Sequence, residues 1–303
     1  MEILLIMLVG AGAGRFFPAK YKEKNEKVQL FCTLLLIFSM GVSLGQREGF
    51  FAELGTLGVQ SFLFFLIPAV FSVAAVYLLT RRFMGGKQRE DGGRAAGNRQ
   101  GKGDPMVFLA LGSLLLGTGS NVVPALADFF KPLASHSDWI LWVLMFSVGI
   151  SVGLHRGLLS RLCQYHVKIL VIPLGIILGS LAGGVLCGLL LKYPLNEAVS
   201  VAGGLGWYSL AGVYVGNMAG ARLGSIAFLS NLLREIGSFF MIPCIARYLN
   251  AYTCIAPAGA TSEDTTLPML IRYTNEETVV FAVLNGVVCS IFVPVLLSFC
   301  YSF

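Results

Sequence analysis

Glu235 is an acidic side chain near the middle of an apolar segment, residues 223–249, that is long enough to cross a membrane. A charged side chain at the bilayer centre costs about 2.5–3.5 kcal/mol, so it persists where it is paired or used. Four polar residues of this segment have the i, i+3, i+4, i+7 spacing of one helix face. They are Asn231, Arg234, Glu235 and Ser238. Such a face suits either an ion pair that locks helices together or a transport or proton-relay site.

A second group of polar residues lies at 259–268, with the sequence GATSEDTTLP. Four hydroxyl side chains surround Glu263 and Asp264: Thr261, Ser262, Thr265 and Thr266. In isolation this would be an extramembrane turn. Its apolar flanks indicate instead a dip into the membrane, where non-helical backbone must be buried in protein or line a wet cavity. We expect Asp264 and Glu235 to face one such cavity.

Two carboxylates among hydroxyls suit an ammonium-bearing substrate, H⁺ or Na⁺, and would repel an anion. Close like charges also favour a proton remaining on one of the two groups, which makes proton coupling feasible. Arg234 either neutralises Glu235 or binds a substrate carboxylate in bidentate fashion. A zwitterionic amino acid with an extra cationic end would use every one of these groups.

A glycine-rich stretch, VAGGLGWYSLAG at 201–212, interrupts another apolar segment. Each glycine costs a helix about 1 kcal/mol relative to alanine, and glycine lets the backbone unwind. Trp207, Tyr208 and Ser209 lie within the stretch. The aromatic rings could stack on a cationic group for about 0.5–2 kcal/mol. Anchoring of Trp and Tyr at the membrane interface is the alternative.

The composition indicates an all-α polytopic membrane protein. The 303 residues are 56% hydrophobic and only 13% charged, against about 25% charged in soluble domains. About eight transmembrane helices are expected, at 3–17, 28–45, 57–80, 106–126, 139–154, 169–191, 223–249 and 279–303. The broken segments 195–218 and 251–270 either cross or re-enter.

The basic residues predict the orientation. Residues 81–104 carry seven basic and three acidic side chains, so the positive-inside rule makes loop 81–105 cytoplasmic. The basic loops around 20–27 and 156–168 then also lie inside. Both termini are therefore predicted to lie on the outer side of the inner membrane. The net charge of +6 reflects this topology, and no nucleic-acid partner is expected.

An internal repeat is indicated by FSMGVSLGQREG at 38–49 and FSVGISVGLHRG at 146–157, offset by 146 − 38 = 108 residues. If each unit holds three crossings, the second copy is inverted, which is a recurrent plan of secondary transporters. Chance similarity and close helix packing through small residues are the alternatives. The single domain then divides into three-span units at 1–80 and 106–192, a linker at 81–105, and a motif-bearing part at 193–303.

No cofactor or metal is expected. The seven cysteines have no CxxC spacing, and the three histidines form no ligand pattern. The phosphate-binding pattern GxxxxGK[ST] is absent as well, so the energy for transport must come from a gradient.

Four sequence blocks resemble the bacterial lysine exporter (LysO) family. They are GWYSL at 206–210, GSIAFLSNLLRE at 224–235, MIP at 241–243 and GATSEDTTLP at 259–268. The resemblance implies an inner-membrane carrier that exports L-lysine and its toxic analogues, with about eight spans and both termini outside. It also implies two essential intramembrane acids, which match Glu235 and Asp264. Glu263 departs from the family pattern.

We therefore expect a secondary exporter of L-lysine, coupled to H⁺, embedded in membrane lipid. The expected binding residues are Glu235, Asp264, Asn231, Arg234, Trp207, Tyr208, Ser209, Thr261, Ser262 and Thr265. A cation/proton antiporter or Na⁺-coupled carrier is the alternative. An intramembrane protease is disfavoured because Asp264 would have to recruit Glu235 as its partner. A homo-oligomer is compatible with the sequence.

Overall fold

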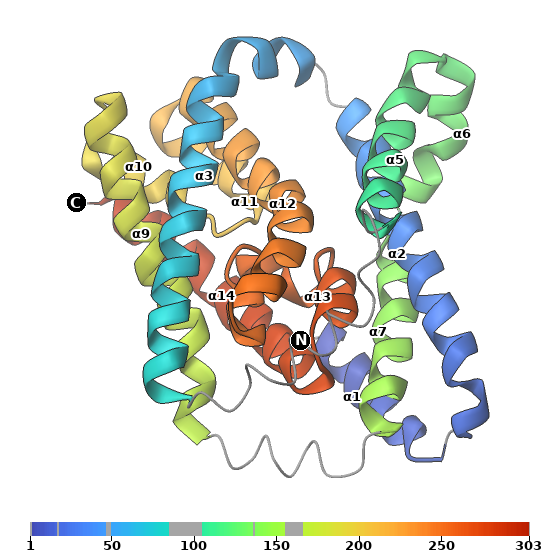
Figure 1. Cartoon of the computed structure of the whole chain (residues 1–303). Coiled ribbons are helices and arrows are strands. Elements are labelled where there is room, and N and C mark those ends of the chain that lie inside the picture. Colours follow the sequence, from blue (N-terminus) through green and yellow to red (C-terminus); the bar gives the residue numbers. More distant parts are fainter. Residues whose placement is uncertain are drawn as a thin grey trace. The chain divides into compact units, whose positions relative to one another are not determined.

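The computed structural model describes residues 2–16, 18–46, 50–84, 105–135, 137–154 and 166–302. Within these ranges the chain is helical and contains no strand, which confirms the all-α prediction (Figure 1). The predicted linker 81–105 lies almost wholly outside the described residues, as does the basic loop near 156. The α-helices are α1 (Glu2–Gly14), α2 (Lys22–Gly45), α3 (Phe50–Phe83), α5 (Pro105–Gly119), α6 (Pro124–Ser135), α7 (Ser137–Leu154), α9 (Val171–Leu191), α10 (Leu195–Ala202), α11 (Tyr208–Ala219), α12 (Ala221–Tyr248), α13 (Leu267–Tyr273) and α14 (Glu276–Tyr301).

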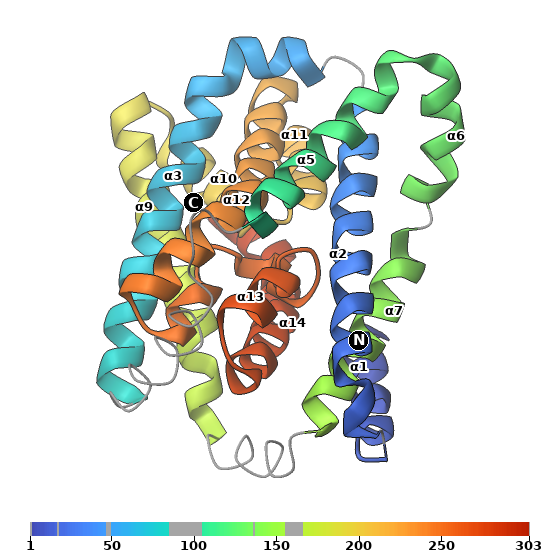
Figure 2. The ribbon, with the colours of Figure 1, turned by 45° about the vertical axis from the view of Figure 1, so that its right-hand side comes forward.

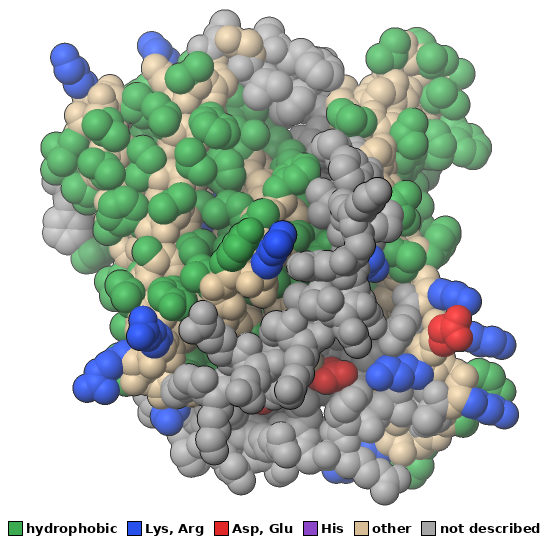
Figure 3. Space-filling view, viewed as in Figure 1, with side chains coloured by type: hydrophobic (Ala, Val, Ile, Leu, Met, Phe, Trp, Pro, Cys, Tyr) green, Lys and Arg blue, Asp and Glu red, His purple; other side chains and the backbone are tan. Residues whose placement is uncertain are grey.

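Five helices among the described residues contain stretches long and apolar enough to span a bilayer. The stretches are Lys22–Ser43, Leu57–Phe83, Lys168–Leu191, Ala221–Tyr248 and Glu276–Tyr301. Hydrophobic side chains cover the visible face of α3 and α9, with Lys and Arg side chains near the helix ends (Figure 3). Leu78 on α3 is 64% exposed and Leu178 on α9 is 60% exposed, as lipid-facing side chains would be. The chain is thus a multi-pass helical membrane protein, and the count of eight crossings stays a prediction.

The chain divides into two compact units. Unit 1 comprises residues 1–50 and 100–164, and unit 2 comprises residues 51–99 and 165–303. In unit 1, α1 packs on α7 and α2 packs on α5 (Figure 2). A Cβ on Gly10 would collide with the carbonyl oxygen of Phe146, and a Cβ on Gly117 would collide with that of Phe38. Small residues therefore let both helix pairs approach closely.

The expected span 106–126 is wrong at its C-terminal end. Helix α5 ends at Gly119, and a 3₁₀ turn at Ser120–Val122 leads into α6, which forms where a loop was expected. Proline is favoured at the first position of a helix because it has no N–H to leave unpaired, and Pro124 begins α6. The amide of Asn121 donates to the carbonyl of Val42 at 3.1 Å and fixes the turn against α2.

In unit 2, α3 and α9 run antiparallel in close contact. A Cβ on Gly179 would lie 2.6 Å from the Cα of Ser72, and a Cβ on Gly183 would lie 2.5 Å from the Cα of Pro68. A second face of α9 packs on α10, where a Cβ on Gly184 would lie 2.8 Å from the Cβ of Ala202. Glycines on two faces of α9 thus set the spacing of three helices.

The two ends of the first broken segment lie close together. Near its beginning, the Asn196 amide donates to the carbonyl of Tyr301 at 3.2 Å. Near its end, the Tyr301 hydroxyl donates to the carbonyl of Met218 at 2.8 Å. Both ends therefore lie beside the last turn of α14. The segment consists of α10, a non-helical first break at 203–207, and α11.

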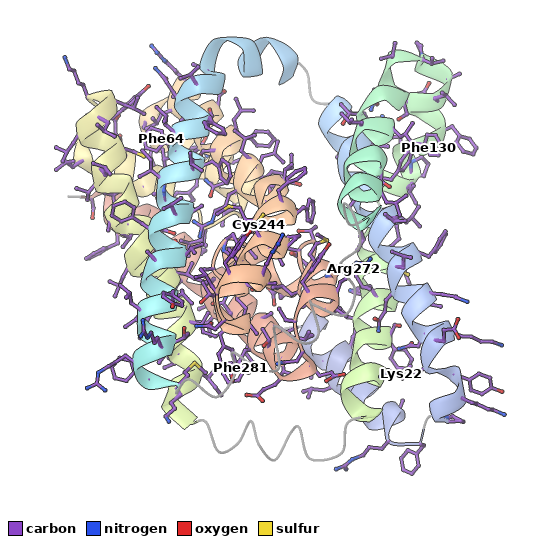
Figure 4. All side chains as sticks on the ribbon, in the orientation of Figure 1. Lys22, Phe64, Phe130, Cys244, Arg272 and Phe281 are labelled. Carbon is purple, nitrogen blue, oxygen red and sulfur yellow. The ribbon has the colours of Figure 1, made fainter. Side chains whose placement is uncertain are left out.

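The two ends of the second broken segment also lie close together. Near its start, the Tyr252 hydroxyl donates to Glu277 in the first turn of α14, and the Tyr252 ring packs on Phe281 at 5.1 Å between centroids. Figure 4 labels Phe281 on α14. The segment ends with α13, whose last residue, Tyr273, is separated from α14 by Thr274 and Asn275. The two segments thus enter from opposite ends of α14.

Candidate functional site

The two broken segments meet where their α-helices are interrupted, at the first break (203–207) and the second break (256–266). The second break contains a 3₁₀ turn at Gly259–Glu263. The amide of Ala260 donates to the carbonyl of Leu205 at 2.9 Å. Leu205, Gly206 and Gly259 have positive φ angles of 48°, 99° and 61°. A Cβ on Gly259 would collide with the Leu205 carbonyl oxygen, so glycine is needed there both for its φ angle and for the close approach.

Asn231 of α12 holds the first break in place. Its side-chain oxygen accepts from the amide of Gly206 at 2.8 Å, and its nitrogen donates to the carbonyls of Val201 at 3.2 Å and Ala227 at 2.8 Å. An unwound helix leaves backbone groups without partners. Asn231 satisfies two of those groups, so the structure uses it to support the first break.

Arg234 lies at the middle of α12 and is only 2% exposed. Its guanidinium donates to the carbonyls of Pro257 and Ala256 at 3.1 and 3.2 Å, both in the second break. It also donates to the hydroxyls of Ser180 at 2.8 Å and Ser72 at 3.3 Å. We expected Arg234 to pair with Glu235 or a substrate carboxylate, but these four bonds go to neutral acceptors.

Glu235 is 1% exposed, and its Oε2 atom is buried without a hydrogen-bond partner among the described residues. Its side chain lies within electrostatic range of Thr265 and Asp264. A buried polar atom without a partner costs about 1–3 kcal/mol, and more if it is charged. This carboxyl group is therefore suited to hold a proton or to receive a cation.

The adjacent acids Glu263 and Asp264 are held by different parts of unit 2. Asp264 accepts from the amide and the hydroxyl of Thr265 at 2.6 and 3.3 Å. Glu263 accepts from the Ser290 hydroxyl of α14 at 3.1 Å. A Cβ on Gly286 would lie 2.5 Å from the Cβ of Glu263, so glycine makes room for this contact. Asp264, and not Glu263, is the acid that bonds to Thr265 and interacts with Glu235.

Most hydroxyls of the second break bond to backbone carbonyls. Thr261 donates to Ala258 at 2.9 Å, and Ser262 donates to Ala282 of α14 at 2.7 Å. The amide of Asn285 donates to Ser262 and to Gly259, both at 2.9 Å. Thr261 and Ser262 therefore build the break, while the Thr265 hydroxyl bonds to Asp264 near Glu235.

The three polar residues after the first break have different surroundings. Tyr208 begins α11, packs edge-to-face on Phe228 with 5.3 Å between ring centroids, and interacts electrostatically with Glu235 and Asp264. Trp207 is 37% exposed and Ser209 is also exposed. Of the three, Tyr208 is brought to the acids.

Three residues that the sequence analysis did not select also belong to this region: Ser72, Ser180 and Asn285. Asn285 is a buried amide in an apolar helix, which is itself a signal. Ser72 and Ser180 are separated by 180 − 72 = 108 residues, the same offset as the repeated FS motifs. That coincidence was readable in the sequence.

Taken together, the site is a junction of the two breaks at the middle of α12. Glu235, Asp264, Thr265 and Tyr208 meet there. Broken helices and buried acids at such a junction are features of secondary transporters, which bind solutes near the membrane midplane. The fold and this junction thus define a polytopic membrane protein of the transporter class.

Comparison with known proteins identifies the family. Residues 109–301 match the family model for the lysine exporter LysO, so the chain belongs to this family. It is 29% identical over 304 residues to the lysine exporter LysO of Escherichia coli (strain K12), covering 98% of each chain. It is 34% identical over 165 residues to a putative lysine exporter of Haemophilus influenzae, covering 54% of this chain and 84% of the relative. No solved structure matches.

Proposed function

We propose that this protein exports L-lysine and its toxic analogues across the inner membrane in exchange for H⁺. Lysine carries two ammonium groups, and the junction offers Glu235 and Asp264 to bind either an ammonium group or a proton. Membership of the lysine exporter family and the lysine-exporter names of two relatives support the substrate. The energy source is an ion gradient.

One observation carries the role of the acids: Glu235 is buried with an unpartnered carboxyl oxygen beside Asp264. Keeping such a group costs stability, which is typical of intramembrane acids that bind ions or protons. Tyr208 and Thr265 complete the binding group. Asn231, Thr261 and Ser262 act by shaping the breaks, and Trp207 and Ser209 lie at the exposed edge of the first break.

We also infer an inverted repeat in the transporter core. Gly10 approaches Phe146 in unit 1, and Gly117 approaches Phe38. Phe38 and Phe146 are the first residues of the two repeated motifs, so the same helix contact occurs twice with the roles of the copies exchanged. The α1–α7 and α2–α5 pairs run parallel, while α3 and α9 run antiparallel, as inversion of the second copy requires.

The test is efflux of labelled lysine from preloaded proteoliposomes under an imposed pH gradient. Wild-type protein is compared with Glu235→Gln and Asp264→Asn, which keep side-chain size and remove the charge. We expect lysine efflux from wild type and at least about a tenfold loss in each variant. Thermal stability in detergent controls for folding, because removing a buried acid need not destabilise the protein.

Two outcomes would contradict the proposal. Wild-type vesicles that move Na⁺ or H⁺ but no lysine would make the protein a cation/proton antiporter. Full lysine efflux by both variants would show that the two carboxyl groups are not needed for binding or coupling.

A further inference from the structure

Arg234 ties three parts of unit 2 together through one guanidinium. On one side it donates to Ala256 and Pro257, the carbonyls that begin the second break. On the other it donates to Ser180 of α9 and Ser72 of α3. Both serines are fully buried. Arginine remains charged in proteins and presents five donors in a fixed plane, so it can hold several acceptors in a set geometry.

The serine pair is itself built by close helix packing. The Ser72 and Ser180 hydroxyl oxygens lie 2.9 Å apart, and Ser72 also donates to Pro68 and Ile176 at 2.8 and 3.2 Å. Gly179 permits this distance, since a Cβ there would lie 2.6 Å from the Cα of Ser72. The two serines share the 108-residue offset of the repeated motifs. Each copy thus supplies one hydroxyl to the same guanidinium.

The position of Arg234 along the chain connects this anchor with the acids. Arg234 precedes Glu235 on α12, and the carbonyls that it holds lie seven and eight residues before Asp264. The guanidinium therefore connects α12 and the start of the second break to the same two serines. A substrate carboxylate could reach Arg234 only by displacing bonds to buried backbone carbonyls, which would then lack partners.

We propose that Arg234 is a positioning residue, which anchors the second break to the Ser72–Ser180 pair and so sets Asp264 against Glu235, and that the substrate carboxylate is bound elsewhere. This inference rests on the proposed function for its effect on transport. The anchoring can be measured without substrate.

The first experiment is hydrogen exchange on the full-length protein in the absence of lysine. Arg234→Lys keeps the charge but lacks the planar set of donors. We expect backbone exchange at 258–266 to rise about tenfold in Arg234→Lys and in the Ser72→Ala/Ser180→Ala double variant, while α11 is unchanged, because local opening follows lost contacts. Ser200→Ala is the matched control: Ser200 is also fully buried, but it donates to Leu297.

The second experiment separates positioning from carboxylate binding. Affinities are measured for L-lysine and for L-lysine methyl ester, which has both ammonium groups but no carboxylate. We expect Arg234→Lys to lower turnover about tenfold and to change both affinities by the same factor. The double serine variant should lower turnover several-fold with lysine affinity within about twofold of wild type.

Two results would overturn the inference. The first is unchanged exchange at 258–266 in Arg234→Lys and the double variant. The second is an Arg234→Lys protein that loses lysine affinity about tenfold while keeping its affinity for the ester, since Arg234 would then bind the carboxylate. Wild-type protein that fails to bind lysine would contradict the proposed function instead, and the exchange result would still decide whether Arg234 anchors the break.

Discussion

The neighbouring acids of the second break, Glu263 and Asp264, have different surroundings. Glu263 is satisfied by Ser290 and packed against Gly286 of α14, whereas Asp264 lies with Glu235 and Thr265. Consecutive side chains point in different directions, and a broken helix makes that difference large. Asp264 has φ −129° and ψ −101°, outside the helical region. The local backbone therefore selects which acid reaches the junction.

Substituting the two acids separately tests this division. Asp264→Asn should reduce lysine efflux at least about tenfold, because it removes a charge from the binding group. Glu263→Gln should leave efflux within about threefold of wild type, because the amide still accepts from Ser290. Initial efflux rates at matched protein density give the comparison, and the opposite ranking would assign the binding role to Glu263.

The sequence located the important side chains but not their contacts. The i, i+3, i+4, i+7 spacing on α12 correctly groups Asn231, Arg234 and Glu235 on a buried face. It could not reveal that Asn231 holds the first break and Arg234 the second. Those contacts depend on backbone carbonyls from distant segments, and sequence periodicity carries no information about such groups.

At the scale of elements, the two breaks depend on single side chains that replace lost helix hydrogen bonds. Asn231 serves Gly206 and Val201 in the first break. Asn285 serves Gly259 in the second. Buried backbone groups without partners are rare in folded proteins, so each break needs its own buried amide.

Removing one such amide should open its break. Asn231→Leu leaves the Gly206 N–H and the Val201 carbonyl without this partner, and we expect a loss of about 2–4 kcal/mol in unfolding free energy. Asn217→Leu, at an exposed position of α11, should change it by less than about 0.5 kcal/mol. Thermal unfolding in detergent measures both, and equal midpoints would contradict the role given to Asn231.

The course of the first broken segment can be tested by labelling. Leu195→Cys and Asn217→Cys place thiols at exposed positions near its two ends. A segment that re-enters predicts that a membrane-impermeant maleimide labels both positions from the same side. The chain without either substitution measures the background labelling, because its own Cys244 is exposed. Labelling of the two positions from opposite sides would mean that the segment crosses.

The sequence predicted where the helices are interrupted, but not whether the interrupted segments cross or re-enter. Gly-rich 201–212 and GATSEDTTLP indicated interrupted helices, and both are interrupted. Crossing and re-entry could not be separated, since the answer depends on where Tyr301 of α14 meets Asn196 and Met218. The α5–α6 break was missed because Ser120–Val122 contains no glycine or proline, although Pro124 follows it.

At the scale of the whole molecule, membrane orientation follows from the loops and the re-entrant segments. If both broken segments re-enter and the eight crossings expected from the sequence hold, both termini share a side. A short epitope after Ser302 should therefore be reached by antibody only from outside the inner membrane, as the basic loops predict. Detection only after permeabilisation of the inner membrane would reverse the proposed orientation.

In the proposed transport cycle, lysine and a proton bind in turn to the buried carboxyl groups at the junction. The most direct measurement follows luminal pH in proteoliposomes loaded with lysine, with membrane voltage clamped. Wild type should acidify the lumen as lysine leaves, and Glu235→Gln should abolish this coupled proton entry. Lysine efflux without proton entry, or efflux that requires Na⁺, would contradict the account.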